Sequence, residues 1–127
     1  MTHVLVVHHD VDVADLEVDE LRRAGYEVTQ CAGPTAGPCP VLEGRHCWMA
    51  DAADVLVYDV WSAGDGGHEL IEGLRQLYPD TPVVLTTEGQ LLDWVAEEGP
   101  YRVTPLVGAP TRAGLVAVIE AALGSAA

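Results

Sequence analysis

Three cysteines and one histidine lie in a short stretch and have the clearest potential for metal or redox chemistry. Cys31, Cys39 and Cys47 recur at every eighth position, and His46 precedes the last of them. Thiolates and imidazoles are ligands for Zn²⁺ and iron–sulfur clusters, although this spacing lacks the CxxC pairs of common zinc modules. Three free or partly buried thiols, or one labile disulfide with a thiol left over, are open alternatives. The four residues form a candidate metal or redox site.

A second group of polar residues follows two apolar runs. His8, His9 and Asp10 come directly after residues 4–7, and Asp59 follows residues 55–58. Adjacent residues on a strand point to opposite faces, so we expect one histidine to pack or hydrogen-bond inside the protein. The other could join Asp59 on a borderline ion such as Zn²⁺. Alternatively, Asp59 is a carboxylate at a strand end that only hydrogen-bonds loop amides.

Composition excludes several classes of function. The 127 residues include 20 acids and six bases, for a net charge of −14, and every base is arginine. Without lysine there is no Walker-type phosphate lysine, Schiff base or lysine general base, and no nucleophile–base pair indicates an enzyme. The negative charge argues against nucleic acid and anionic membranes. No apolar run approaches the ~20 residues of a membrane span. We expect a cytoplasmic single domain over residues 1–127.

Short apolar runs rich in β-branched residues predict the strands that position these groups. Continuous rather than alternating apolarity is typical of strands buried on both faces, as in a parallel sheet. Residues 26–29 alternate and indicate an edge strand, and Pro105 weakens the prediction for the last run. The expected strands cover residues 4–7, 26–29, 55–58, 83–85 and 103–107.

Helical patterns alternate with these strands and predict a three-layer α/β fold. The first helix begins at an Asp12 cap and ends at Gly25. Three Pro and three Gly within residues 31–47 prevent a long helix there and leave a turn over residues 49–53. The expected inward side chains are Val13, Leu16, Leu21 and Ala24, then Leu70, Ile71, Leu74, Leu77 and Tyr78, then Leu91, Leu92, Val95 and Ala96, and, after a Thr111 cap, Leu115, Val118, Ile119, Ala122 and Leu123.

The order of elements and four motifs resemble the receiver domain of bacterial response regulators over nearly the whole chain. The motifs are HVLVVHHD, ADVLVYDVWSAGDGG, GGHELIEGLRQLYPDTPVVLTT and PLVGAPTRAGLVAVIEAAL. The resemblance implies a doubly wound parallel five-stranded sheet of flavodoxin-like order 2-1-3-4-5, with the second helix largely replaced by the Cys/Pro/Gly-rich loop. It also places Asp59 at the phosphoacceptor position, Thr87 (or else Thr86) at the hydroxyl switch position and Gly67 at the loop glycine.

The chain departs from the family at the residues that carry its chemistry. His8 and His9 stand where the family has the acidic pair that binds magnesium, Ala109 where it has a lysine, and Leu106 where it has the aromatic switch residue. Mg²⁺ prefers oxygen ligands, and the charge that develops on an aspartyl phosphate needs a neighbouring cation. We therefore expect Mg²⁺-dependent phosphorylation to be weak or absent.

The resemblance implies a stand-alone, atypical receiver without an output domain, acting in signal transduction. Its partner would be a protein, either a sensor kinase or a downstream regulator. The chain itself would be a monomer or weak dimer. By family position, His9 is the histidine that would join Asp59, and a divalent metal is the one cofactor candidate. The alternative is a metal- or redox-sensing binding protein that uses Cys31, Cys39, Cys47 and His46 on the same scaffold.

Overall fold

The computed structural model describes residues 2–31, 39–59, 67–87, 103–107 and 111–126. Each expected strand is present, and its bounds differ from the expected ones by two residues at most. The helix expected over residues 91–96 lies outside the described residues. The elements in chain order are β1 (His3–Val7), α1 (Val11–Arg23), β2 (Glu27–Cys31), α2 (Trp48–Asp51), β3 (Val55–Asp59), α3 (Gly67–Leu77), β4 (Val83–Thr87), β5 (Val103–Val107) and α5 (Arg112–Ala126).

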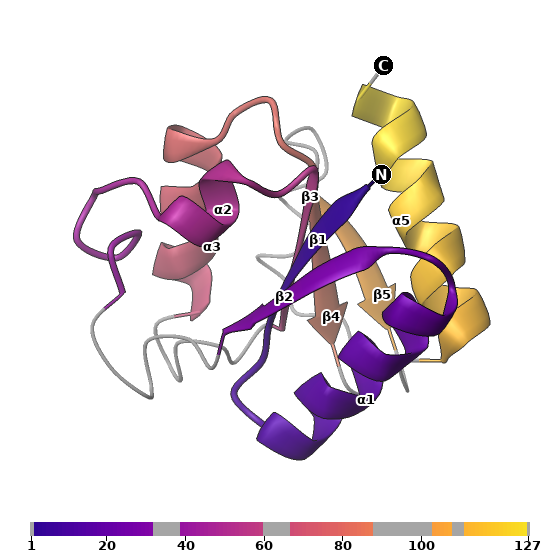
Figure 1. Cartoon of the computed structure of the whole chain (residues 1–127). Helices are drawn as coiled ribbons and strands as arrows, with labels where there is room; N and C mark the ends of the chain where they lie inside the picture. The colour runs from indigo at the N-terminus through magenta and orange to yellow at the C-terminus, as the bar shows by residue number, and fades with distance from the viewer. Residues whose placement is uncertain (1, 32–38, 60–66, 88–102, 108–110, 127) are drawn as a thin grey trace.

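The strands form one parallel sheet in the predicted order, β2-β1-β3-β4-β5 (Figure 1). The chain leaves β1 toward β2 on one side and returns to β3 on the other. In open α/β sheets of this kind, functional groups gather at the carboxyl ends of the two strands between which the order reverses. Val7 pairs with Tyr58, so the residues that follow β1 and the last residue of β3 lie side by side.

Helices cover both faces of the sheet and divide the core into two clusters. In Figure 1, α1 and α5 lie on one side of the sheet and α2 and α3 on the other. Successive side chains of β1 alternate between these clusters: Val4 and Val6 contact the α1–α5 side, and Leu5 and Val7 the α2–α3 side. All five residues of β3 are buried. This two-sided burial explains why the strands read as continuous apolar runs.

Helix α1 begins two residues earlier than expected. The cap is Asp10, whose Oδ1 accepts the backbone N–H groups of Asp12 (3.0 Å) and Val13 (3.4 Å). The prediction of Asp12 as the cap was therefore wrong: both residues are good caps, and the end of β1 at Val7 selects the nearer one. Gly25 ends the helix as predicted, with φ +98°.

The inward face of α1 also differs from the prediction. Leu16 is 48% exposed and Ala24 is exposed, whereas Leu21 is fully buried. The stripe that meets the sheet repeats at i, i+3, i+4 and i+7 from the first turn, and Leu16 lies outside it. Its buried members are Ala14, Glu17, Val18 and Leu21.

The faces predicted for α3 and α5 are confirmed. Leu70, Ile71 and Leu74 of α3 are inaccessible to solvent, and so are Leu115 and Ile119 of α5. The hydroxyl of Thr111 accepts the backbone N–H of Gly114 (3.1 Å), which confirms the predicted cap of α5. None of the helices in the described ranges is long and apolar enough to cross a bilayer.

The short helix α2 is tied to α3 by one phenol. The hydroxyl of Tyr78 accepts the backbone N–H of Cys47 (2.8 Å) and lies 2.6 Å from Oδ1 of Asp51, to which it donates. Burial, reinforced by this hydrogen bond, raises the pKa of Tyr78 to about 12, and the same bond lowers the pKa of Asp51. Two hydrogen bonds thus stand in for part of the packing that a full-length second helix would provide.

The two leucines of α1 test its orientation. We expect Leu21→Ala to lower the free energy of unfolding by about 2–5 kcal/mol, because it leaves a cavity in the core. Leu16→Ala, at a half-exposed position of the same helix, should cost less than about 1 kcal/mol. Chemical denaturation of both variants measures the difference, and equal losses would contradict the orientation of α1.

Removing the Tyr78 hydroxyl tests the anchor of α2. We expect Tyr78→Phe to lower the free energy of unfolding by about 1–3 kcal/mol, because the buried N–H of Cys47 loses its acceptor. The pKa of Asp51 should rise toward its ordinary value, as measured by NMR titration. A carboxyl group with a depressed pKa stabilises the fold at pH values above its unfolded-state pKa. This stabilisation is lost as the pH falls through the folded-state pKa. The stability of Tyr78→Phe should therefore depend less on pH in the acid range. The control Tyr26→Phe should leave the pKa of Asp51 unchanged.

Candidate functional site

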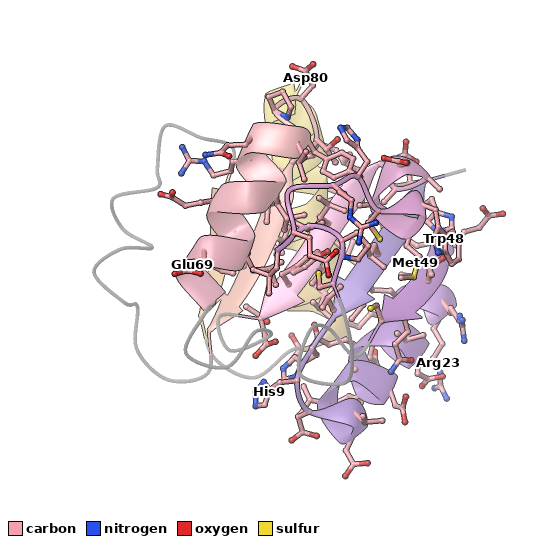
Figure 2. The ribbon with its side chains drawn as sticks, turned by 90° about the vertical axis from the view of Figure 1, so that its left-hand side faces the viewer. His9, Arg23, Trp48, Met49, Glu69 and Asp80 are labelled. Atoms are coloured by element: carbon pink, nitrogen blue, oxygen red, sulfur yellow. The ribbon has the colours of Figure 1, made fainter. Side chains whose placement is uncertain are left out.

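Two histidines and one aspartate meet at the carboxyl ends of β1 and β3. His8 and His9 follow the last residue of β1, and Asp59 is the last residue of β3. Each can offer one metal-ligating atom, and these atoms all lie within 4.8 Å of one another. In Figure 2, His9 lies at the end of the sheet opposite Asp80, which precedes β4. The cluster therefore occupies the edge where the strand order reverses, as the sequence predicted.

His9 holds the carboxylate of Asp59 at both oxygens. Its backbone N–H donates to Oδ1 (3.1 Å), and its ring Nδ1 lies 2.5 Å from Oδ2. Since a carboxylate can only accept, Nδ1 carries the proton. The Asp59 side chain is 4% exposed and that of His9 is 41% exposed. An almost buried carboxylate is thus stabilised by a residue that reaches solvent.

His8 is buried beneath His9 and is linked to α1. Its Nδ1 accepts the backbone N–H of Asp10 (2.9 Å), and its Nε2 lies 3.9 Å from Oε2 of Glu17. Both side chains are almost inaccessible, at 2% and 1%. The proton of a neutral His8 is therefore on Nε2, directed toward Glu17. Glu17 was not among the expected site residues, because it lies in the observed buried stripe of α1 and not on the face predicted for that helix.

The two histidine rings stack, with centroids 4.9 Å apart and planes inclined by 19°. The expectation that they begin on opposite faces of the sheet was wrong. β1 ends at Val7, so His8 and His9 lie beyond the last paired residue, and strand alternation no longer sets their directions. This turn allows both rings to approach Asp59.

The remaining receiver-like positions are described only in part. Thr86 pairs with Asp59 in the sheet, is buried, and donates from Oγ1 to the carbonyl of Tyr58 (3.5 Å). Thr87 and Leu106 are placed in β4 and β5 by their backbones, and their side chains lie outside the described residues. Ala109, at the family's lysine position, also lies outside them.

The donor set does not fit the magnesium ion of the receiver family. Mg²⁺ requires a near-octahedral shell of oxygen ligands, usually from carboxylates and water. Here a single carboxylate, that of Asp59, accompanies two imidazoles, which are better ligands for Zn²⁺, Cu²⁺ and Ni²⁺. These three residues, His8, His9 and Asp59, are called the strand-end cluster below. Among the described residues, it is a nitrogen-rich site.

The three cysteines lie on the α2–α3 side of the sheet, in or against one core cluster. Cys47 belongs to the α2–α3 core cluster, and Cys31 and Cys39 are half-buried against it. Burial raises the pKa of the Tyr58 hydroxyl well above its usual value, and the proximity of Cys39, Cys47 and Cys31 raises it further. All three cysteines thus lie in or against the core cluster that also contains Tyr58, and none is in a disulfide.

The predicted grouping of His46 with these cysteines is not found. His46 is exposed, lies 3.4 Å from Oδ1 of Asp51 and makes an edge-on contact with the ring of Tyr78. Within the described ranges, the one group of three residues close enough to share an ion is the strand-end cluster, and it contains no cysteine. The cysteines thus form a shared packing region without preformed metal geometry.

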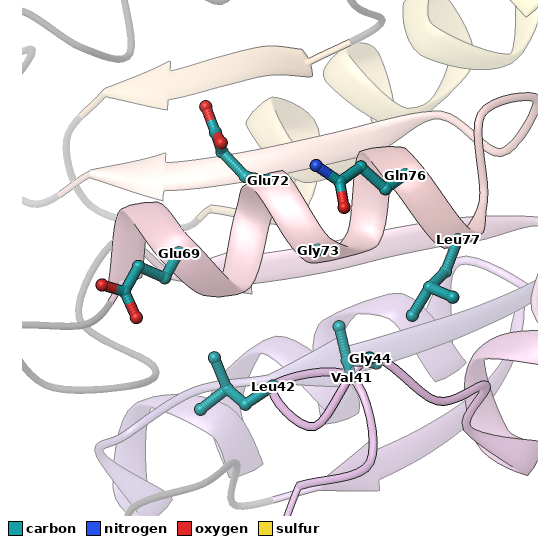
Figure 3. Close-up of a pocket in the computed structure, with 8 residues that line it drawn as sticks. All are labelled: Val41, Leu42, Gly44, Glu69, Glu72, Gly73, Gln76 and Leu77. Carbon is teal, nitrogen blue, oxygen red and sulfur yellow. The ribbon is translucent and has the colours of Figure 1, made fainter.

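A separate cavity of about 300 Å³ lies between α3 and the loop that precedes α2 (Figure 3). Gly73 permits the close approach of these segments: a Cβ there would meet Cγ1 and the carbonyl oxygen of Val41 at 3.2 Å. The cavity shares no residue with the strand-end cluster. Its lining residues are Val41, Leu42, Gly44, Glu69, Glu72, Gly73, Gln76 and Leu77.

Comparison with known proteins finds similarity in structure. No family model and no curated protein matches the sequence. A response regulator receiver domain protein from Clostridium thermocellum has a TM-score of 0.79 at 18% identity, over 98% of this chain and 96% of that one. The Vibrio cholerae chemotaxis protein CheY4 has a TM-score of 0.73 at 22% identity, over 96% of this chain and 98% of that one.

A longer protein matches over one part of its length. NtrX from Brucella abortus, in complex with ADP, has a TM-score of 0.75 at 21% identity. The match covers 99% of this chain, which spans only 27% of NtrX. At these identities the likeness concerns the backbone, and it agrees with the strand order described above. The chain therefore has the fold of the response regulator receiver domains.

Proposed function

We propose that this chain is a receiver-type signalling domain that works through contact with a protein partner. Its Asp59 accepts a phosphoryl group from Mg²⁺-dependent donors weakly or not at all. The partner is a sensor kinase or a downstream regulator in the cytoplasm, and the chain acts as a monomer or weak dimer without enzymatic activity. The observation that carries this proposal is the contact of His9 with both carboxylate oxygens of Asp59.

Phosphoryl transfer needs an oxygen that Asp59 does not readily offer. One carboxylate oxygen must bond to phosphorus while the bond to the donor's leaving oxygen breaks. Oδ1 accepts the backbone N–H of His9, and Oδ2 lies 2.5 Å from its ring nitrogen. Turning the ring away would expose an oxygen but would leave an almost buried carboxylate without one of its donors. This supports a low reactivity of Asp59.

The charges around Asp59 support the same conclusion. The product is a phosphoryl group with two negative charges, and neighbouring cations normally offset them. The chain has no lysine, and its net charge is −14. The cluster contains one carboxylate and two imidazoles where magnesium would need several oxygens. The negative charge also supports a protein rather than a nucleic acid as the partner.

Labelling with a small acyl phosphate and Mg²⁺ tests the proposal. We expect the wild type to label at least about tenfold more slowly than His9→Asp with Ala109→Lys, which restores a carboxylate and a cation. Adding Asp59→Asn to that double variant should abolish the label. His46→Asp with Ala109→Lys is the matched control, since His46 lies away from the cluster. Rapid, stoichiometric labelling of the wild type that disappears in Asp59→Asn would refute weak phosphorylation. Equal labelling of the wild type and the double variant would refute the charge argument, and equal labelling of the double variant and the control would show that replacing His9 has no effect.

Redox sensing by the three cysteines is a second candidate function. It is favoured by the burial of Cys47 in the α2–α3 core cluster and by the packing of Cys31 and Cys39 against that cluster. Hydrogen peroxide would oxidise two of these thiols to a disulfide and be reduced to two molecules of water. Such a bond would join elements of the α2–α3 side that now only pack together. A change in that packing would be the signal.

Thiol chemistry of the native protein tests this candidate. We expect fewer than three thiols to react rapidly with a chromogenic disulfide, with Cys47 the slowest because it is 7% exposed. Mild peroxide treatment should remove two hydrogens by mass, and Cys31→Ser should both lower the melting temperature and reduce this oxidation. If all three thiols react at the rate of the unfolded chain and peroxide forms no disulfide, the redox reading fails and the signalling role stands alone.

A further inference from the structure

The strand-end cluster has the composition and geometry of a transition-metal site. We propose that His8, His9 and Asp59 bind a borderline divalent ion of the zinc class, in preference to magnesium. The proposal does not depend on the signalling role, because it concerns ion binding by the protein alone.

The distances place the donors within reach of one ion. One atom from each residue lies within 4.8 Å of the others, and Nδ1 of His9 is 2.5 Å from Oδ2 of Asp59. Two tetrahedral ligands at zinc distances are roughly 3.3 Å apart, so this pair must separate by about 0.8 Å. His9 is 41% exposed and follows the end of β1, so its ring can make that movement. As the ion enters, Nδ1 gives up its proton and Nε2 takes one from solvent, so the ring binds the ion as a neutral imidazole.

His8 can supply the third ligand with a supporting carboxylate already in place. Binding through Nδ1 displaces the N–H of Asp10 and leaves Nε2–H directed at Glu17, 3.9 Å away. Metal-bound histidines commonly donate their second ring N–H to a carboxylate, which orients the ring and increases its basicity. Glu17 is 1% exposed at the base of the cluster, so it acts as a positioning residue rather than a ligand. Water completes the coordination shell.

The ligand types decide which ion is preferred. Imidazole nitrogens bind Zn²⁺, Co²⁺, Ni²⁺ and Cu²⁺ well, whereas Mg²⁺ keeps to oxygen ligands. Two nitrogens and one carboxylate are also the usual complement of open zinc sites, which keep one position for water or another ligand. The net charge of −14 raises the local concentration of any cation. The same substitutions that remove magnesium chemistry thus create a site for a different ion.

Cobalt titration tests the proposal, because the Co²⁺ spectrum reports its ligands. The starting protein carries Cys31→Ser, Cys39→Ser and Cys47→Ser, so that thiolates cannot bind the ion, and thermal unfolding verifies that it folds. We expect visible bands of a nitrogen- and oxygen-bound Co²⁺ at one ion per chain, which Zn²⁺ abolishes and a large excess of Mg²⁺ does not. His9→Gln and Asp59→Asn should each weaken binding at least about tenfold. His46→Gln, which removes another exposed histidine beside a carboxylate, should leave it unchanged.

The outcomes separate the strand-end cluster from other sources of binding. Weaker binding in both cluster variants, with no change in His46→Gln, supports the site. Equal binding in His9→Gln and in the cysteine-free starting protein overturns it, as does displacement by Mg²⁺ at similar concentration. If the cobalt spectrum of the protein with its cysteines shows thiolate charge-transfer bands and the cysteine-free protein binds no ion, the ion belongs to the thiols and the proposal is wrong.

Discussion

The carboxylate of Asp59 lies at the end of a buried strand with 4% of its side chain exposed, and everything around it reflects the cost of that position. A carboxylate removed from water loses several kcal/mol of solvation unless hydrogen bonds or opposite charge replace it. His9 provides the replacement with one backbone and one ring donor. Because His9 contacts both oxygens, the reactivity of Asp59 and its capacity for ions depend on where His9 lies.

That position follows from how the parallel sheet is covered. Helices on both faces leave the strand ends as the place where polar side chains can meet solvent and each other. β1 stops at Val7, Asp10 caps α1, and the two histidines form the short connection between them. On its buried side, His8 contacts Glu17 and accepts a hydrogen bond from the backbone of Asp10, and these contacts fix the connection. The early start of α1 is therefore part of the site as well as of the fold.

The backbone fold of this protein does not by itself decide which side chains stand at its functional edge. Its backbone matches receiver domains at TM-scores of 0.73–0.79, yet the identities are 18–22% and the acidic pair is replaced by histidines. A fold can host different chemistry when the side chains at its functional edge change. On the α2–α3 side of the sheet, the four-residue α2 is fastened by Tyr78, and Cys31, Cys39 and Cys47 lie in or against the same core cluster. Both departures concern side chains and loops, whereas the sheet retains its order.

The resemblance to receiver domains implied the strand order and the proximity of His9 to Asp59, while the sequence by itself determined the strands and the helix faces of α3 and α5. These follow from local patterns, since apolar periodicity and strand ends are readable one segment at a time. Tertiary structure decided the rest. Asp10 rather than Asp12 caps α1 because β1 ends where its pairing with β3 ends, and Leu16 faces solvent because that cap sets the rotation of the helix. The same start of α1 places Glu17 under His8, and the turn beyond the paired residues stacks the two histidine rings. Such contacts join elements far apart in the sequence or outside any regular repeat, so no local pattern contains them.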